Sequence, residues 1–170
     1  MAETRSGVGV LDLQGGVQEH IEHFARLGVQ AVRVKHPHQF DTLAGVVIPG
    51  GESTCLARLL RIFDLESALC RAYRDGMRLW GTCAGAILLA TENVGDTPHL
   101  GLIDMAVQRN AFGSQLESFT DSVDAPAVAD RPIELVFIRA PKIVRVGPGV
   151  RVLLSVRDFI AAVETADILV

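Results

Sequence analysis

The first half of the chain alternates short apolar runs with stretches of helical periodicity, and this alternation constrains the fold more than any other feature. The runs at residues 7–13, 30–35, 44–48 and 78–80 have the length and composition of buried strands. Helical patterns separate them at residues 17–27, 53–61 and 65–74, and another covers residues 84–91. Strands that alternate with helices form parallel sheets covered on both faces. The sequence therefore predicts an α/β protein with a mainly parallel central sheet.

The second half of the chain has a different pattern. Short strand candidates follow one another with little helix between them, at residues 102–109, 133–139, 142–146, 151–155 and 159–164. They predict antiparallel or mixed strands added to the same sheet, with residues 121–131 as a loop. The 170 residues contain no internal repeat and no linker, so we expect a single domain over residues 1–170.

Composition excludes several classes of protein. Sixteen Lys and Arg against twenty Asp and Glu give a net charge of −4, with no basic block that would bind nucleic acid. No apolar run approaches the roughly 18 residues of a membrane span. Three cysteines are too few for a disulfide scaffold, and the polar N-terminus has no signal-peptide core. We therefore expect a cytoplasmic protein that acts on neither nucleic acid nor membranes.

A G-x-C-x-G segment lies between a predicted strand and a predicted helix. Gly81 and Gly85 flank Cys83 and permit a tight, strained turn, the geometry of a nucleophile elbow. Such a turn presents the side chain at the carboxyl ends of the strands, where open α/β sheets bind ligands. The helix N-terminus is expected to stabilise the Cys83 thiolate, and the Ala84 N–H an oxyanion. A buried structural cysteine is the weaker interpretation, because it gives the two glycines no role.

A second glycine turn, Pro49-Gly50-Gly51-Glu52, also follows a strand and precedes a helix. Paired glycines let backbone N–H groups point at a ligand, as in an oxyanion hole. An ordinary turn with Ser53 or Thr54 as the helix cap explains the same segment equally well. No Gly-Lys-Ser/Thr follows, so the turn is not a phosphate-binding P-loop.

The histidines do not indicate a metal site. His20 and His23 lie three residues apart on one predicted helix, but no third ligand converges with them. His20 lies toward the apolar face, which is typical of a half-buried packing residue. No histidine is an evident partner for Cys83, and we predict neither a metal nor a cofactor.

Five segments, spread in order over almost the whole chain, resemble one known family. They are VLDLQGGVQEH (10–20), VVIPGGEST (46–54), WGTCAGAILLA (80–90), GLIDMAVQRNAFGSQLESF (101–119) and FIRAP (137–141). The chain resembles the glutaminase subunits of pyridoxal 5′-phosphate synthase, within the class I (triad) glutamine amidotransferases. GTCAG alone indicates only the wider superfamily, whereas PGGEST, RNAFG and FIRAP together are typical of this subunit.

The resemblance implies a three-layer, flavodoxin-like α/β/α sandwich. It also implies hydrolysis of L-glutamine to L-glutamate and ammonia, with ammonia passed to a separate synthase subunit. Carried over by motif, Cys83 is the nucleophile that forms a thioester. The implied glutamine-binding residues are Gly51, Glu52, Ser53, Arg109, Ile138 and Arg139. The implied oxyanion region contains Gly51, Ala84 and Gln14.

The resemblance further implies a His-Pro-Glu motif after the last strand, which would supply the general base and its orienting carboxylate. The 170 residues do not contain this motif, and they stop inside an apolar run at Val170. We therefore expect an incomplete chain, with the His and Glu a few residues beyond Val170. If the chain ends there, catalysis is expected to collapse, because triad members act as a unit. The alternative function is an inactive, glutaminase-like subunit that only binds the synthase.

Overall fold

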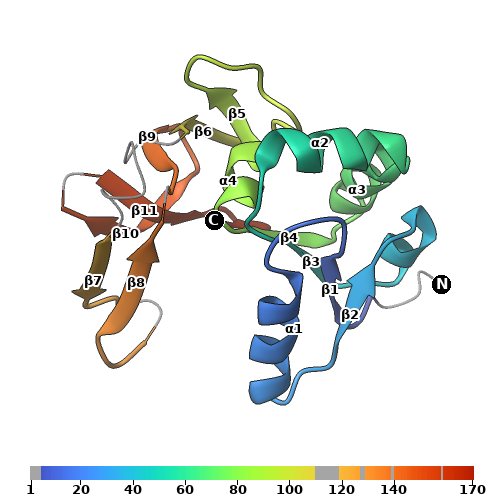
Figure 1. Ribbon diagram of the computed structural model, residues 1–170, viewed down its shortest axis with the longest axis horizontal. Helices are drawn as coiled ribbons and strands as arrows, with labels where there is room; N and C mark the ends of the chain where they lie inside the picture. Colours follow the sequence, from blue (N-terminus) through green and yellow to red (C-terminus); the bar gives the residue numbers. More distant parts are fainter. Residues whose placement is uncertain (1–4, 110–118, 127–128, 139, 158) are drawn as a thin grey trace.

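The computed structural model describes residues 5–109, 119–126, 129–138, 140–157 and 159–170 (Figure 1). Its helices are α1 (Val17–Arg26), the 3₁₀ helix η1 (Pro37–Asp41), α2 (Ser53–Ile62), α3 (Leu65–Arg74) and α4 (Ala84–Leu89). The strands of the first half are β1 (Val8–Leu11), β2 (Ala31–Val34), β3 (Gly45–Ile48), β4 (Arg78–Gly81) and β5 (Ala90–Asn93). Those of the second half are β6 (Ile103–Gln108), β7 (Phe119–Val123), β8 (Ile133–Phe137), β9 (Lys142–Val146), β10 (Arg151–Val156), β11 (Phe159–Glu164) and β12 (Ile168–Leu169).

The main sheet has the strand order β2-β1-β3-β4-β12-β11-β9-β6-β5, with β10 paired to β11. The pairs from β2 to β12 are parallel, whereas β11 pairs antiparallel with β12, β9 and β10. Strands β7 and β8 form a separate antiparallel hairpin, which lies far from β2 (Figure 1). The prediction of a mainly parallel sheet extended by antiparallel strands is confirmed.

Helices cover both faces of the parallel half of the sheet. Along β3, Val46 and Ile48 pack with α2, α3 and α4, while Val47 packs on the opposite face with α1. Successive side chains of a strand point to opposite faces, so an uninterrupted apolar strand requires helices on both sides. In Figure 1, α1 lies on one side of the sheet and α2 and α3 on the other. This arrangement is the expected three-layer α/β/α sandwich.

Three loops meet at one edge of this sheet. Strands β1, β3 and β4 are parallel neighbours, so their carboxyl ends point in the same direction. The segments that follow them, residues 12–16, 49–52 and 82–83, contain the predicted functional turns. The strand order therefore places both glycine turns and the cysteine turn beside one another.

Two local predictions were wrong. The helix expected over residues 84–91 ends at Leu89, and Ala90–Asn93 forms β5, which pairs with β6. Every residue of α4 is buried, so its apolar run has no polar face to distinguish a helix from a strand. The loop expected over residues 121–131 begins later, because Phe119–Val123 is a strand. Thr120 and Ser122 are exposed, whereas Asp121 is partly buried on the face that carries Phe119 and Val123.

No helix among the described residues is long and apolar enough to cross a membrane.

Candidate active site

Cys83 lies in the turn between β4 and α4 and has a strained backbone. Its φ of 49° and ψ of −100° are unusual for a residue with a side chain. The turn is held because the Thr82 N–H donates to the Ile48 carbonyl oxygen (3.0 Å) and the Gly85 N–H donates to the Thr82 carbonyl oxygen (2.8 Å). Strain at a residue that the surrounding backbone fixes is the signature of a nucleophile elbow. The sequence prediction of this elbow is therefore confirmed in geometry.

The two glycines around Cys83 are required by close packing. A Cβ at Gly85 would lie 2.1 Å from the Ile48 carbonyl oxygen, because the start of α4 lies directly against β3. A Cβ at Gly81 would lie 2.6 Å from Leu89 Cδ1. Side chains at either position would separate α4 from the sheet and change the turn that presents Cys83.

The backbone N–H groups of Gly51 and Ala84 lie near the Cys83 thiol. They lower the pKa of the thiol, but the surrounding protein atoms raise it more, so the pKa of Cys83 lies above its ordinary value. The N–H group at the start of the helix thus acts in the expected direction, but desolvation outweighs it in the net pKa of Cys83. Helix α4 has only six residues, and desolvation exceeds the effect of its N–H groups. The thiol is mainly protonated at neutral pH and needs a base.

The two glycine turns interlock next to Cys83. The Gly16 N–H donates to the Gly50 carbonyl oxygen (2.9 Å), and the Glu52 N–H donates to Gln14 Oε1 (3.0 Å). The amide of Gln14 lies over Gly51, where a Cβ would meet its nitrogen at 2.5 Å. Gln14 is thus beside the oxyanion region, as predicted, and it holds the turn that carries the Gly51 N–H.

Glu52 caps α2, which corrects the expectation that Ser53 or Thr54 would do so. Its carboxylate accepts the N–H groups of Thr54 (2.9 Å) and Cys55 (2.6 Å). The Thr54 N–H is the main reason that the pKa of Glu52 lies below its ordinary value. Ser53 is 2% exposed, and its hydroxyl has no hydrogen-bond partner among the described residues. Protein atoms therefore close off this hydroxyl from solvent in the structure.

Arg109 comes from the end of β6 and reaches the same turn. Its guanidinium contacts Glu52 Oε1 (3.3 Å), Thr54 Oγ1 (3.4 Å) and Asp96 Oδ2 (2.5 Å). The structure therefore brings Arg109 to Glu52, another residue of the implied glutamine site. Asp96 was not predicted, because a lone aspartate in a turn gives no signal of its partner 13 residues away.

Cys83 also lines an apolar cavity of about 490 Å³. Thr82, Ala86, Phe137 and Ala140 contribute to its wall. Ile138 is 58% exposed and does not line this cavity, so the described structure does not bring it to Cys83. Arg139, the other predicted residue of this segment, lies outside the described residues.

His20 lies close to the elbow but does not contact Cys83. Its Nε2 atom is 3.1 Å from Thr82 Oγ1, and its ring packs edge-on against Trp80. No histidine among the described residues forms a hydrogen bond with Cys83. The described residues also contain no group of three or more His, Cys, Asp or Glu arranged to hold a metal ion.

Comparisons with known proteins identify one family. The model of the SNO glutamine amidotransferase family matches residues 10–170. Pyridoxal 5′-phosphate synthase subunit PdxT of Syntrophus aciditrophicus (strain SB) is 57% identical, over 98% of this chain and 74% of its own length. The subunit of the same name from Clostridium botulinum (strain Loch Maree / Type A3) is 46% identical, over 96% of this chain and 86% of its own length.

Solved structures show the same fold. A crystal structure of a glutamine amidotransferase superposes with a TM-score of 0.89 at 40% identity, over 96% of this chain and 87% of that chain. The structure of PurLQS from Thermotoga maritima has a TM-score of 0.66 at 16% identity, over 98% of this chain and 85% of that chain. The second likeness concerns the fold alone. The matches over nearly the whole length, together with the elbow and its N–H pair, show that the chain belongs to the SNO glutamine amidotransferase family.

Proposed function

We propose that this protein is a glutaminase that hydrolyses L-glutamine to L-glutamate and ammonia through a thioester on Cys83. The observation that carries the proposal is the pair of N–H groups, from Gly51 and Ala84, at the thiol. Two donors at this place would hold the oxyanion that forms when sulfur attacks the side-chain amide of glutamine. Collapse of that intermediate releases ammonia and leaves a glutamyl thioester. Water then releases glutamate and restores the thiol.

We assign roles to the other predicted site residues from the contacts that they make in the structure. Gln14 and Glu52 fix the turn that carries Gly51. The Ser53 hydroxyl is buried, so Ser53 stays in the proposal on the PGGEST motif alone. Arg109 would complete the glutamine site through its contact with Glu52. Ile138 and Arg139 remain in the proposal on the FIRAP motif alone.

Proton transfer sets a further requirement. The pKa of Cys83 is raised by its surroundings, so attack on the amide needs a base that removes the thiol proton. The same group, once protonated, would supply the proton that ammonia takes as it leaves. The described residues place no histidine at Cys83, and a base must come from elsewhere for turnover.

The proposed partner is a pyridoxal 5′-phosphate synthase subunit that receives the ammonia. Relatives that are 57% and 46% identical are named as PdxT subunits of that synthase. We further propose that residues 1–170 form a single glutaminase domain. A cytoplasmic location remains part of the proposal, in line with three unpaired cysteines.

Transfer of labelled nitrogen tests this proposal. We expect that the protein, mixed with a pyridoxal 5′-phosphate synthase subunit, its phosphosugar substrates and L-glutamine labelled with ¹⁵N in the side-chain amide, yields pyridoxal 5′-phosphate that carries ¹⁵N. The measurement is the mass of the product. Glutamine labelled only in the α-amino group is the matched control, and its label is expected to stay in glutamate.

Two outcomes would redirect the proposal. If the two proteins form a complex but no glutamate appears, the protein is the inactive subunit that only binds the synthase. If ammonia forms at the same rate in the mixture but never enters the product, the glutaminase assignment stands and the partner is wrong.

A further inference from the structure

Thr82, the residue before Cys83, is held by three hydrogen bonds. Its N–H and its carbonyl oxygen bond to Ile48 and Gly85, and these two bonds form with any side chain at this position. The third bond joins its hydroxyl to His20 Nε2 at 3.1 Å. This bond requires both a hydroxyl at position 82 and an imidazole at position 20. It is therefore a specific link between α1 and the elbow.

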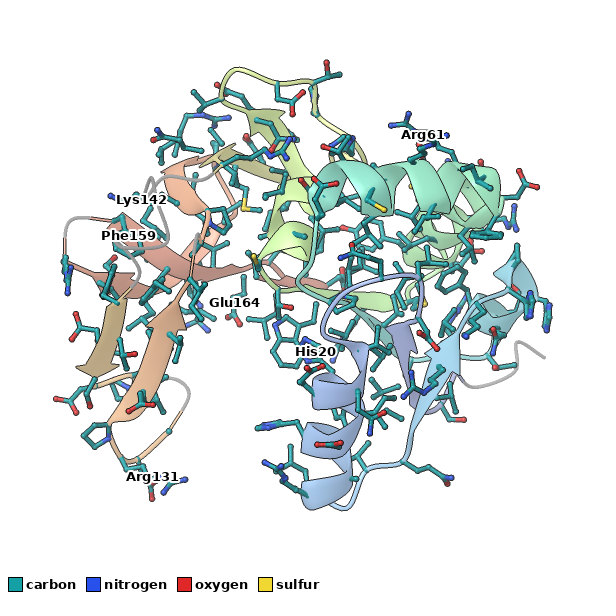
Figure 2. The ribbon with its side chains drawn as sticks, in the orientation of Figure 1. His20, Arg61, Arg131, Lys142, Phe159 and Glu164 are labelled. Atoms are coloured by element: carbon teal, nitrogen blue, oxygen red, sulfur yellow. The ribbon has the colours of Figure 1, made fainter. Side chains whose placement is uncertain are left out.

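His20 is itself fixed by its neighbours. Its ring meets the Trp80 indole edge-on, with ring centroids 5.4 Å apart, and Phe24 packs against the same indole at 6.3 Å. Trp80 and Thr82 are two residues apart, so their side chains lie on the face of the sheet that α1 covers. Figure 2 shows His20 near the end of α1 that is closest to the sheet. Ring packing thus fixes the imidazole independently of its hydrogen bond to Thr82.

The surroundings of His20 favour its neutral form. Burial lowers its pKa, the nearby His23 lowers it further, and Glu19 has the opposite, smaller effect. The side chains that meet it from β4 and from the turn after β4, Trp80 and Thr82, carry no charge. A neutral imidazole bonds to a hydroxyl without bringing a positive charge beside the thiol.

We propose that His20 is a positioning residue for the nucleophile elbow, and that it holds Cys83 in front of the Gly51 and Ala84 N–H groups through the Thr82 hydroxyl. The inference rests on the proposed function, which makes Cys83 the nucleophile. A non-glycine residue at φ 49° persists only where its neighbours fix it, and the His20–Thr82 bond is one such fixing point.

Helix α1 also holds the other half of the site. It begins directly after Gly16, whose N–H donates to the Gly50 carbonyl oxygen, and His20 follows one turn later. The helix therefore sets both the turn that carries the Gly51 N–H and the turn that carries Cys83. A shift of α1 would change the distance between the thiol and its donors.

Alkylation of Cys83 by iodoacetamide tests the link in the intact chain. We expect Thr82→Val and His20→Leu each to slow the reaction at Cys83 about threefold to tenfold, the change that follows the loss of one hydrogen bond. The reason is that a displaced thiol loses N–H donors that stabilise its thiolate. The double variant is expected to react no slower than the slower single variant, because both changes remove the same bond. Thr82→Ser keeps the hydroxyl and should react like the wild type.

Peptide mapping by mass spectrometry gives the rate at each cysteine separately, so Cys55 and Cys70 serve as references in every sample. Arg26→Leu is the control, because Arg26 is exposed on the same helix and does not contact His20. Thr82→Val replaces an oxygen by a methyl group, so the test survives if His20→Leu fails to fold. Rates within about twofold of the wild type, or additive effects in the double variant, would overturn the positioning role.

Protection by L-glutamine separates this inference from the proposed function. If glutamine protects Cys83 from alkylation but the two substitutions show no coupling, only the positioning role fails. If the coupling is present but glutamine never protects Cys83, the positioning of the cysteine stands and the glutaminase proposal fails.

Discussion

Replacement of Cys83 by alanine is expected to lower glutamine hydrolysis by about 10³-fold or more, because the groups of a catalytic unit depend on one another. The substitution removes the sulfur that would form the thioester and leaves the Gly51 and Ala84 N–H groups without a nucleophile. Fold stability should change little, since Cys83 is exposed at the elbow. The measurement is glutamate released per minute by wild type and variant, each mixed with the synthase subunit.

Cys70→Ala is the control for this prediction. Cys70 lies within α3, away from the elbow, and its removal should leave turnover within about twofold of the wild type. A Cys83→Ala variant that hydrolyses glutamine at a rate comparable to the wild type would remove Cys83 from the nucleophile role.

Gly15→Ala is expected to displace the glycine turns and to destabilise the fold by about 2–4 kcal/mol, combining left-handed strain with overpacking. Gly15 has a φ of +97°, and a Cβ there would lie 1.9 Å from the Gly50 carbonyl oxygen. That oxygen belongs to the backbone, so the whole turn must shift. Gln14 and the Gly51 N–H would shift with it, and turnover should fall together with stability.

Gly16→Ala is the matched control at the neighbouring position. A Cβ at Gly16 would meet Glu19 at 3.6 Å, an ordinary contact, and its φ is −75°. We expect it to cost no more than about 1 kcal/mol, the usual range for a helix cap. Urea unfolding of both variants measures the difference. Equal costs for Gly15→Ala and Gly16→Ala would show that the contact with Gly50 does not determine the turn.

Local sequence patterns were sufficient to predict the elements that build the site. Short apolar runs located β1, β3 and β4, and the ten residues of α1 are enough to show an apolar helical face. The elbow was predicted because two glycines at fixed spacing around Cys83 have a specific backbone use. Here the chemistry depends on residues that are neighbours in the chain.

Contacts between distant residues could not be predicted in this way. Glu52 caps α2, although Ser and Thr are the more usual capping types, and its carboxylate also meets Arg109. Arg109 is held by Asp96, and Thr82 by His20 across 62 positions of sequence. These partners depend on strand order and side-chain packing. Cys83 is exposed as a residue, but protein atoms around its sulfur raise the pKa of the thiol, and motif spacing does not report this effect.

The most direct test of the central claim is the mass of the Cys83 peptide after the protein, with its synthase partner, is mixed with L-glutamine and quenched in acid. The account predicts that this peptide carries one glutamyl group, that the peptides of Cys55 and Cys70 carry none, and that hydroxylamine removes the group. Release of ammonia from glutamine without a glutamyl group on Cys83, or with that group on another residue, would contradict the account.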